Sequence, residues 1–250
     1  MPRRPMTSPI SLSEVPQVRA QPADHDLVAH RRQQIVAAAA ELFSRKGFEA
    51  TTVSEIAAAA GISTGLIYHY ARTKEDVLFL VLLTVVDSYR IELPPAMAAF
   101  EQPVDKLRAG VRAYCGVIDR KMDATVLTYR TTKVLPRAHR ETIKQAEIDT
   151  NALIENCIRD GIGAGQFRDV DPVIAAYQFV AFAHNWALKS WRLHALVTLD
   201  EYFAAGFDML LRGIVTPQGW ELYQARLAAD GARGHAADDK QDPNEGKQHG

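Results

Sequence analysis

The sequence contains few of the residue combinations on which catalysis and metal binding depend. Only two cysteines occur among its 250 residues, Cys115 and Cys157, and their wide separation matches neither a zinc-ligand spacing nor a disulfide framework. Such cysteine use is typical of a reducing cytosol. No G-x-S-x-G, H-E-x-x-H or glycine-rich phosphate-binding motif is present. We therefore expect a protein that is not an enzyme and that has no metal site and no cofactor.

Long apolar runs and a strong net charge are missing as well. The apolar run Val77–Val86 is followed by Asp87 and is too short to cross a bilayer. Residues 1–25 are rich in Pro, Ser and Gln and contain no apolar segment like that of a signal peptide. The formal net charge of −1 excludes a general polyanion binder but permits a local basic surface. These features predict a cytoplasmic protein without a membrane partner.

Alternating strand patterns and internal repeats are also absent, whereas apolar residues recur at helical spacing through most of the chain. We expect an all-α protein of about nine helices. The helix that starts at Lys74 is expected to end before Pro94, and the one that follows Asp171 is expected to reach His194. Residues 1–28 are predicted to form a disordered arm and residues 229–250 a disordered tail, because they offer little apolar surface to bury.

The most informative segment of the chain runs from Thr51 to Asp76. Thr52 and Glu55 have the spacing of a capping box, in which hydroxyl and carboxylate satisfy free N–H groups at a helix start. Gly61 is suited to the left-handed backbone that ends a helix. Between them lies an apolar stripe at helical spacing, formed by Val53, Ile56, Ala57 and Ala60.

A second short helix is predicted directly after this one. Ser63 is a good N-cap residue, and a helix over residues 64–70 would bury Leu66 and Ile67. The other faces of this helix carry Thr64, Gly65, Tyr68 and His69. Caps, glycine and apolar positions fall in register for a helix-turn-helix, whose second helix enters the major groove of DNA. The alternative interpretation is an ordinary helical hairpin inside a core.

The flanking segments fit the same interpretation. Upstream, a helix from about Ala29 to Lys46 has one apolar face, and Gly47 ends it. Downstream, Thr73 and Asp76 form another N-cap pattern. Lys74 would lie in the first turn of that next helix, where a cation is suited to a DNA phosphate.

These residues resemble the DNA-binding domain of the TetR family of bacterial transcriptional regulators. The matching motifs are A-x-x-L-F-x-x-x-G-F from Ala39, T-T-V-x-x-I-A-x-x-A-G-I-S-x-G-x-I-Y-H-Y from Thr51, and T-K-E-D from Thr73. The resemblance covers residues 31–78. Ala71 departs from it, because the family commonly has an aromatic residue there, and Thr64 stands where many members have a basic or larger residue.

The resemblance implies a domain organisation and a function. Residues 29–73 would form a three-helix DNA-binding domain, and residues 74–228 a larger helical domain for effector binding and dimerisation. The protein would act as a homodimer on a palindromic operator in double-stranded DNA, as a repressor that a small-molecule effector releases. The alternatives are an effector-independent DNA-binding protein and a transcriptional activator.

Roles in DNA binding can be assigned to residues of the hairpin. Short side chains at the start of the second helix would approach base edges, and the hydroxyl, imidazole and ammonium groups would contact the backbone. The predicted DNA-binding residues are Thr52, Ser63, Thr64, Gly65, Tyr68, His69 and Lys74.

The last two long helices are the candidate dimer face, because the corresponding helices of TetR-like proteins pack against their twins. The predicted interface residues are Ala176, Phe179, Ala183, Ala187, Phe203, Phe207 and Leu210. The alternative is that these residues only fill the core of one chain.

The effector site is the least defined part of the interpretation. An apolar pocket with a few polar groups would suit an acyl-CoA or another apolar acid derivative. The candidate lining residues are Tyr114, Met122, Tyr129, Arg130, Lys133, His184, Asn185 and Trp186. The alternatives are plain core packing for Tyr114, Met122 and Trp186, a satisfied core or interface histidine for His184, and surface charge for Arg130 and Lys133.

Overall fold

The computed structural model describes the backbone of residues 22–238 and the side chains of residues 27–229. Within residues 22–238 the chain is all-α, as expected, and the bridge between Phe167 and Val215 is its one extended pairing. The eleven α-helices and one 3-10 helix of this range are α1 (Pro22–Lys46), α2 (Val53–Ala59), α3 (Thr64–Ile67), α4 (Lys74–Ala98), α5 (Pro103–Arg120), α6 (Met122–Thr131), η2 (Thr132–Val134), α7 (Arg137–Gly163), α8 (Pro172–Leu188), α9 (Ser190–Leu193), α10 (Leu199–Ile214) and α11 (Pro217–Asp238).

The helices fall into two compact units. Among the described residues, the first unit contains residues 22–90 and Val117–Thr150, and the second contains Ile91–Gly116 and residues 151–238. Helices α4, α5 and α7 therefore contribute residues to both units. The unit that contains the helix-turn-helix candidate extends past residue 73, the expected domain boundary, and includes α6.

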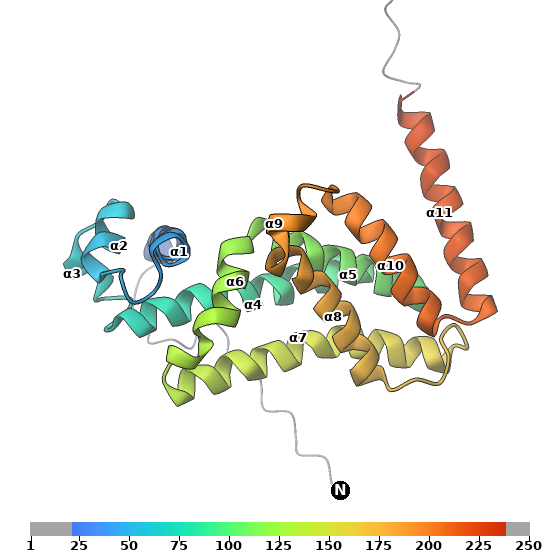
Figure 1. The fold of residues 1–250 in the computed structure, drawn as a ribbon, viewed down its shortest axis with the longest axis horizontal. Coiled ribbons are helices and arrows are strands. Elements are labelled where there is room, and N and C mark those ends of the chain that lie inside the picture. Colours follow the sequence, from blue (N-terminus) through green and yellow to red (C-terminus); the bar gives the residue numbers. More distant parts are fainter. Residues whose placement is uncertain (1–21, 239–250) are drawn as a thin grey trace, which may run out of the picture. The chain divides into compact units, whose positions relative to one another are not determined.

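The first unit is built around α1, which packs against α2 and α6 (Figure 1). Ile35 of α1, Ile56 of α2 and Ile67 of α3 have no exposed surface. Phe43 and Phe48 pack ring to ring with centroids 5.2 Å apart. Burial of this shared apolar surface is the main force that holds α1, α2 and α3 in one arrangement.

The second unit has an aromatic core between α8 and α10, which lie side by side (Figure 1). The ring centroids of Phe179 and Phe207 are 5.6 Å apart, and those of Phe203 and Phe207 are 5.2 Å apart. Tyr223 of α11 adds to the cluster, with its ring centroid 6.1 Å from that of Phe207. The core therefore includes a helix beyond those that sequence reasoning identified.

Gln166 ties three connections of the second unit together. Its side chain is 3% exposed, its Nε2 donates to Gln102 Oε1 at 2.6 Å, and its Oε1 accepts from the N–H of Val104 at 3.1 Å. Its main-chain carbonyl accepts from the N–H of Thr216 at 2.9 Å. The start of α5 is thus bonded to the side chain of this buried residue, and the start of α11 to its main chain.

Gly219 gives a stability prediction at this connection. A Cβ atom at Gly219 would lie 2.2 Å from the main-chain oxygen of Gln166, and backbone cannot rotate away as a side chain can. Gly219→Ala is expected to destabilise the protein by about 1–3 kcal/mol, as overpacking does. Thermal unfolding would show a lower Tm, by about 2–4 °C per kcal/mol for a chain of this size. Gly163→Ala is the control, since nothing lies within 4 Å of a Cβ there; an equal loss in both variants would contradict the steric explanation.

Two helix boundaries at the N-terminal side differ from expectation. Helix α1 begins at Pro22, so residues 22–28 are helical instead of belonging to the predicted arm; residues 1–21 of that arm lie outside the described part of the chain. Helix α3 ends at Ile67 instead of Tyr70. The N–H groups of His69 and Tyr70 donate to carbonyls three residues earlier, which tightens the chain into a turn.

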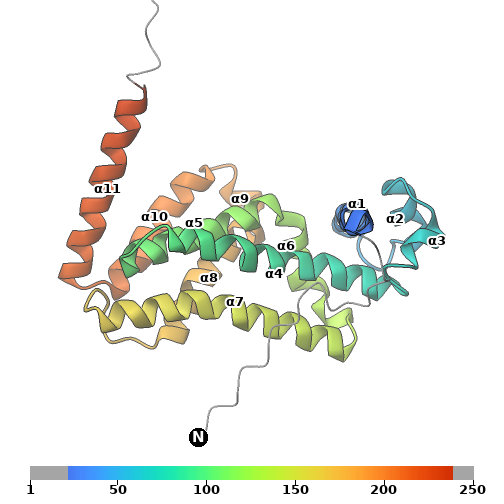
Figure 2. The same ribbon diagram turned by 180° about the vertical axis from the view of Figure 1, so that it is seen from behind.

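Helix α4 continues through Pro94 and Pro95 to Ala98, so the expectation that these prolines end it is wrong (Figure 2). Both prolines occupy exposed positions. A proline removes a hydrogen bond to the carbonyl four residues before it, and such a carbonyl is hydrated when it faces solvent. The helix consequently tolerates the pair near its C-terminal end.

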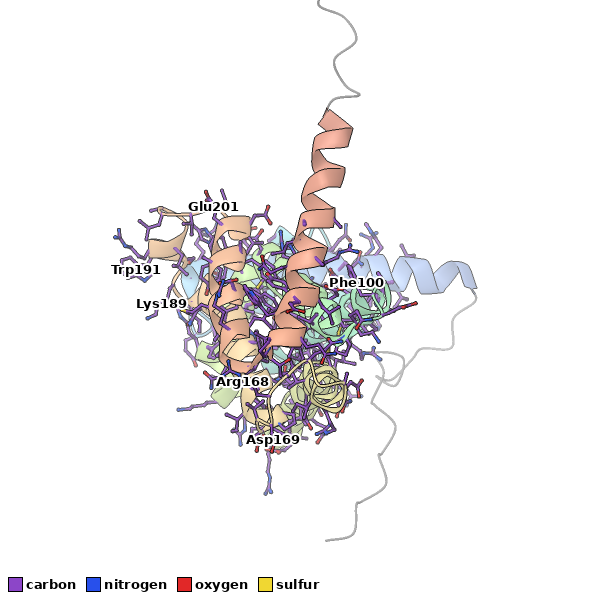
Figure 3. All side chains as sticks on the ribbon, turned by 90° about the vertical axis from the view of Figure 1, so that its right-hand side faces the viewer. Phe100, Arg168, Asp169, Lys189, Trp191 and Glu201 are labelled. Atoms are coloured by element: carbon purple, nitrogen blue, oxygen red, sulfur yellow. The ribbon has the colours of Figure 1, made fainter. Side chains whose placement is uncertain are left out.

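The expected helix from Pro172 to His194 is divided. Lys189 has φ −118° and ψ 21°, outside helical geometry, and α9 begins after it. Trp191 on α9 is 79% exposed and points away from the ribbon (Figure 3). A composition suited to one long helix therefore does not reveal this break.

The structure of the C-terminal helices also differs from the expectation. Helix α10 is capped by Thr198, which forms a capping box with Glu201, and Asp200 lies in its first turn. Helix α11 extends to Asp238, so residues 229–238 of the predicted disordered tail are helical, while residues 239–250 lie outside the described range. Among the helices of residues 22–238, none has both the length and the apolar character required to cross a membrane.

Candidate nucleic-acid interface

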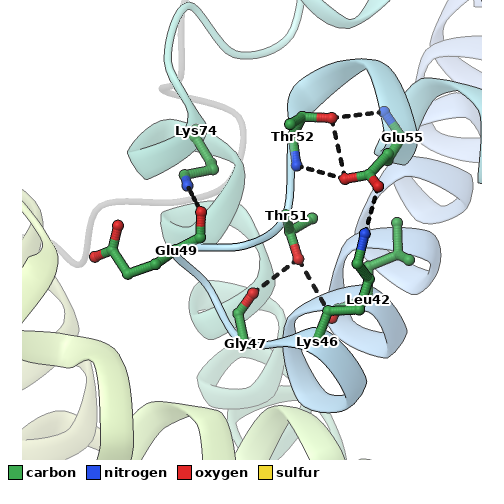
Figure 4. Close-up of polar contacts among 8 residues, drawn as sticks. All are labelled: Leu42, Lys46, Gly47, Glu49, Thr51, Thr52, Glu55 and Lys74. Carbon is green, nitrogen blue, oxygen red and sulfur yellow. Dashed lines mark hydrogen bonds and ion pairs between the residues drawn. The ribbon is translucent and has the colours of Figure 1, made fainter.

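The hairpin formed by α2 and α3 is capped at both helix starts. Thr52 Oγ1 accepts from the N–H of Glu55 at 3.2 Å, and Glu55 Oε2 accepts from the N–H of Thr52 at 2.9 Å (Figure 4). Ser63 Oγ accepts from the N–H of Leu66 at 3.2 Å. These bonds fix where each helix begins, and each cap of this type contributes about 1 kcal/mol.

The turn between the two helices depends on Gly61. Its φ of 68° lies in the left-handed region, where a side chain would be strained. The N–H of Ile62 donates to the carbonyl of Ala57 at 3.0 Å, which closes the end of α2. The turn residue and both caps thus set the angle at which α3 leaves α2.

The predicted contact residues lie mostly on the solvent side of this hairpin. Ser63, Gly65 and His69 are exposed, and Tyr68 is 52% exposed. Ile67, between them in sequence, is completely buried. Helix α3 is therefore held by one apolar side chain and presents a polar face with a glycine near its start. This is the arrangement that a helix requires to enter a groove.

Lys74 has a different environment from the one expected. Its Nζ donates to the main-chain carbonyl oxygen of Glu49 at 3.2 Å (Figure 4). It also donates to that of Phe48 at 2.8 Å and lies 4.3 Å from the centroid of the Phe48 ring. The expected contact of this ammonium with a DNA phosphate stays a prediction. Lys74 fastens the start of α4 to the loop between α1 and α2.

Lys74→Met tests this positioning role. The variant keeps the apolar stem but loses two hydrogen bonds and the cation–π contact, so we expect a loss of about 1–2 kcal/mol in stability. The Tm from thermal unfolding and the affinity from operator titration should fall together. Arg72→Met, a change at a neighbouring exposed cation, is the control for charge alone. An unchanged Tm with reduced operator affinity in Lys74→Met would instead favour a phosphate contact.

Glu55 gives the capped hairpin a pH dependence. An ion-pair hydrogen bond from Lys46 and bonds from the main chain and hydroxyl of Thr52 lower the pKa of Glu55 from 4.5 to about 2. Because the folded pKa is depressed, this stabilisation is fully present above the unfolded value and is lost as pH falls through about 2. Since the group is exposed, salt screens the Lys46 contribution.

Glu55→Gln is therefore expected to lower the Tm at neutral pH, and the difference from the wild-type protein should shrink between pH 4.5 and about 2. Thermal unfolding followed over this pH range measures the effect. Glu41→Gln, at an exposed ion pair with Arg45 on α1, is the matched control. A difference in Tm that does not change with pH would contradict the assignment of the effect to Glu55 ionisation.

Sequence reasoning missed two residues that hold the hairpin in place. Thr51 is 1% exposed, and its Oγ1 donates to the carbonyl oxygen of Gly47 at 2.8 Å (Figure 4). His139 of α7 stacks on Phe79 of α4 with ring centroids 4.1 Å apart, and its Nδ1 lies 3.9 Å from Asp76 Oδ1. The Thr-Thr pair before α2 was a usable signal for Thr51, whereas nothing local indicates the contact of His139.

The predicted dimer residues require a correction. Six of them are at most 4% exposed within a single chain and leave no surface for a second chain: Ala176, Phe179, Ala183, Ala187, Phe203 and Phe207. Leu210 is half-buried. They form the core between α8 and α10, which was the alternative interpretation. The exposed apolar side chains of the same helices are Val173, Ile174, Tyr177 and Met209.

The candidate effector residues are divided between the two units. Tyr114, His184 and Trp186 are buried in the second unit, where Asn185 is exposed. The first unit contains Met122, which is half-buried, together with three exposed residues: Tyr129, Arg130 and Lys133. The rings of Tyr114 and His184 meet edge to face, with centroids 5.5 Å apart. The structure thus brings part of the set together, and the ligand-binding assignment stays a prediction.

Two family models match the chain. The model of bacterial regulatory proteins of the tetR family matches residues 35–81, and the model of the tetracyclin repressor-like C-terminal domain matches residues 101–214. The first match contains α2, α3 and the loops that hold them, and the second reaches the end of α10. Helix α11 lies beyond both matches.

Individual proteins give the same result. The HTH-type transcriptional regulator HbdR of Aromatoleum sp. (strain CIB) is 42% identical over 210 residues, which cover 84% of this chain and 92% of that protein. A tetR-family regulatory protein from Rhodococcus RHA1 superposes with a TM-score of 0.66 at 25% identity, over 73% of this chain and 95% of that chain. AibR, solved in complex with isovaleryl coenzyme A and operator DNA, shares the fold with a TM-score of 0.63 at 24% identity, over 72% of this chain and 98% of that chain. The chain belongs to the TetR family of bacterial regulatory proteins.

Proposed function

We propose that the protein is a homodimeric transcriptional repressor that binds a palindromic operator and is released from it by an acyl-CoA or a related apolar acid derivative. The observation that carries the proposal is the polar, exposed face of α3 on a hairpin with caps at both helix starts. Because bacterial DNA lies in the cytoplasm, the proposal places the protein there. It assigns no catalytic role to any residue.

The contacts with DNA are divided by chemistry. Thr64 and Gly65 open α3 and approach base edges, where a methyl group or bare backbone fits against thymine. Tyr68 and His69 are exposed directly after α3 and supply donors for phosphate or sugar oxygens. Thr52 and Ser63 contribute hydroxyls at the two caps, although Thr52 also serves Glu55. Lys74 acts through position, since it holds α4 against the loop before α2.

The proposed dimer is supported by the exposed apolar side chains of α8 and α10. Ile174 and Tyr177 on α8 are 60% and 41% exposed, and Met209 on α10 is 69% exposed. Ile174, Tyr177 and Ala181 have the i, i+3, i+7 spacing of one helix face. Two such faces from identical chains bury each other in a twofold arrangement. The dimer then offers two recognition helices to successive major grooves, about 34–36 Å apart or a multiple of this distance.

The choice of an acyl-CoA as effector is supported by what AibR binds. That protein was solved with isovaleryl coenzyme A and operator DNA together, and it shares this fold. In the present chain α4 begins directly after the hairpin, its Lys74 binds the loop between α1 and α2, and its Asp76 accepts from the N–H groups of Arg72 and Thr73. A ligand that binds two positions of α4 unequally shifts the population between them and with it the operator affinity.

Mapping of bound genomic DNA is the experiment that tests the proposal. A palindromic site, bound in gel-shift titration by a particle of twice the 27.7 kDa chain mass, is the expected result. Isovaleryl-CoA and longer or aromatic thioesters are then tested for release of that DNA. Binding without release by any thioester would favour an effector-independent regulator, increased transcription of the neighbouring genes would indicate an activator, and failure to bind any duplex would overturn the proposal.

A further inference from the structure

Three polar side chains meet inside the second unit, each from a different helix. Tyr114 of α5, Asn151 of α7 and His184 of α8 are 2%, 2% and 8% exposed. Tyr114 Oη donates to Asn151 Oδ1 at 3.4 Å, and the Tyr114 and His184 rings meet at an interplanar angle of 78°. Buried polar groups are costly unless they are paired, so a cluster of this kind within an apolar core requires an explanation.

The amide of Asn151 is the unusual member of the cluster. Its Oδ1 accepts from Tyr114, but its Nδ2, which has two hydrogens to donate, is buried and has no hydrogen-bond acceptor. Folded proteins leave very few such donors buried, and those that remain are concentrated at sites with a function beyond folding. A donor of this kind beside two other polar side chains indicates an acceptor atom that belongs to a ligand. Binding sites commonly combine an apolar lining with a few placed polar groups in this way.

The charge state of the three side chains restricts which acceptor atom a ligand can place beside them. Burial lowers the pKa of His184 to about 4, so its imidazole is neutral near pH 7. The amide and the phenol are neutral as well. A carboxylate buried against these three groups would find no cation among them, which is strongly unfavourable. A carbonyl oxygen accepts the same hydrogen bond without carrying a charge into the core.

We propose that Asn151, with Tyr114 and His184 beside it, binds the carbonyl oxygen of an uncharged acyl group and so distinguishes an acyl thioester from the corresponding free acid. The inference rests on the proposed function, because it names the chemical feature of the effector that the site recognises. Asn151 donates from Nδ2 to the carbonyl, and Tyr114 orients the amide by donating to its Oδ1. The acyl chain then lies among apolar side chains, and the charged part of a thioester stays outside the cluster.

Thermal shift with the full chain tests the ligand chemistry. Isovaleryl-CoA, benzoyl-CoA and octanoyl-CoA are each compared with the matching free acid and with free coenzyme A at equal concentration. At least one thioester is expected to raise the Tm by several degrees, while its acid and coenzyme A leave the Tm unchanged. Equal stabilisation by the free acid would overturn the inference, as would the absence of any shift across the thioesters.

Asn151→Leu tests the residue, with Asn156→Leu as the matched control on the same helix, since Asn156 is exposed. Asn151→Leu is expected to weaken thioester binding at least about 10-fold, the effect of one lost hydrogen bond of about 1.4 kcal/mol. Asn156→Leu should bind as the wild-type protein does. Retained affinity in Asn151→Leu would overturn the assignment.

The ligand-free protein provides a second readout that does not depend on the choice of thioester. In the double variant Asn151→Leu/Tyr114→Phe, both the amide and the hydroxyl bonded to it are replaced by apolar groups, so the Tm is expected to be unchanged or raised by about 2–4 °C. An amide needed only for folding would instead lower it. Operator binding of the ligand-free variants separates the two proposals: if wild-type protein binds no operator, the proposed function fails, whereas normal operator binding without thioester discrimination overturns only this inference.

Discussion

Gly65→Leu is expected to abolish operator binding while leaving the protein folded. Gly65 is exposed, and the nearest atom to a Cβ built there is Ser63 Oγ at 4.0 Å, so the protein has room for a larger side chain. Its φ lies outside the positive range, so the backbone requires no glycine. Leucine in place of glycine in a helix is favourable by about 0.5–1 kcal/mol. The glycine is therefore explained by something outside the folded chain.

A duplex supplies that explanation, because α3 is near enough to base edges only if its first turn stays slim. Leucine would displace the helix from the groove. Each base contact that is lost costs about 1–3 kcal/mol, so displacement of several is expected to lower operator affinity by on the order of 100-fold or more. Gel-shift titration measures the affinity, and thermal unfolding verifies the fold.

Gly163→Leu is the matched control, since that glycine also has no atom within 4 Å of a Cβ and lies on α7. It should keep both operator affinity and Tm. If Gly65→Leu bound the operator as tightly as wild type, the face of α3 assigned to DNA would be wrong. If it bound weakly but also unfolded at a lower temperature, the glycine would serve the fold instead.

The hairpin was predictable because its signals are local. A capping box, a left-handed glycine and a second cap lie within a dozen residues, and each acts on its neighbours in sequence. The structure contains all three, at Thr52, Gly61 and Ser63. The sequence does not indicate which atoms a long side chain such as that of Lys74 binds. Lys74 lies in the first turn of α4, as expected, yet the carbonyls that it binds are 25 and 26 residues earlier.

The dimer face shows a second limit of sequence reasoning. Helix α8 is apolar on most of its circumference, so helical periodicity does not reveal which side is covered by the same chain. Phe179 and Ile174 look alike as apolar positions, yet one is 2% and the other 60% exposed. Which side faces α10 depends on packing between distant segments, and only the folded chain shows it. Asn151 is a second example, because only the folded chain shows that this polar side chain is buried beside Tyr114.

Ile174→Glu is expected to separate the proposed dimer and to lower operator affinity on the order of 100-fold to 10,000-fold. A carboxylate at the centre of an apolar interface is buried without a cation, which costs several kcal/mol on each side of the twofold axis. Two linked recognition helices bind far more tightly than one, because the second binds at high effective concentration, and the factor lost is of order 10²–10⁴. Light scattering after gel filtration should give a mass near 27.7 kDa instead of twice that value.

Ile148→Glu is the matched control for this change, because it is the same substitution at an isoleucine of α7 that is 52% exposed. Exposed positions tolerate a carboxylate with little change in stability, so this variant should remain dimeric and bind the operator normally. A wild-type chain that is monomeric at micromolar concentration would remove the basis of the prediction. Dimeric Ile174→Glu with native affinity would mean that the chains meet through another surface. Dimeric Ile174→Glu with reduced affinity would mean that α8 affects the spacing of the two recognition helices without joining the chains. The mass and the affinity, measured on the same two variants, therefore separate assembly from DNA recognition.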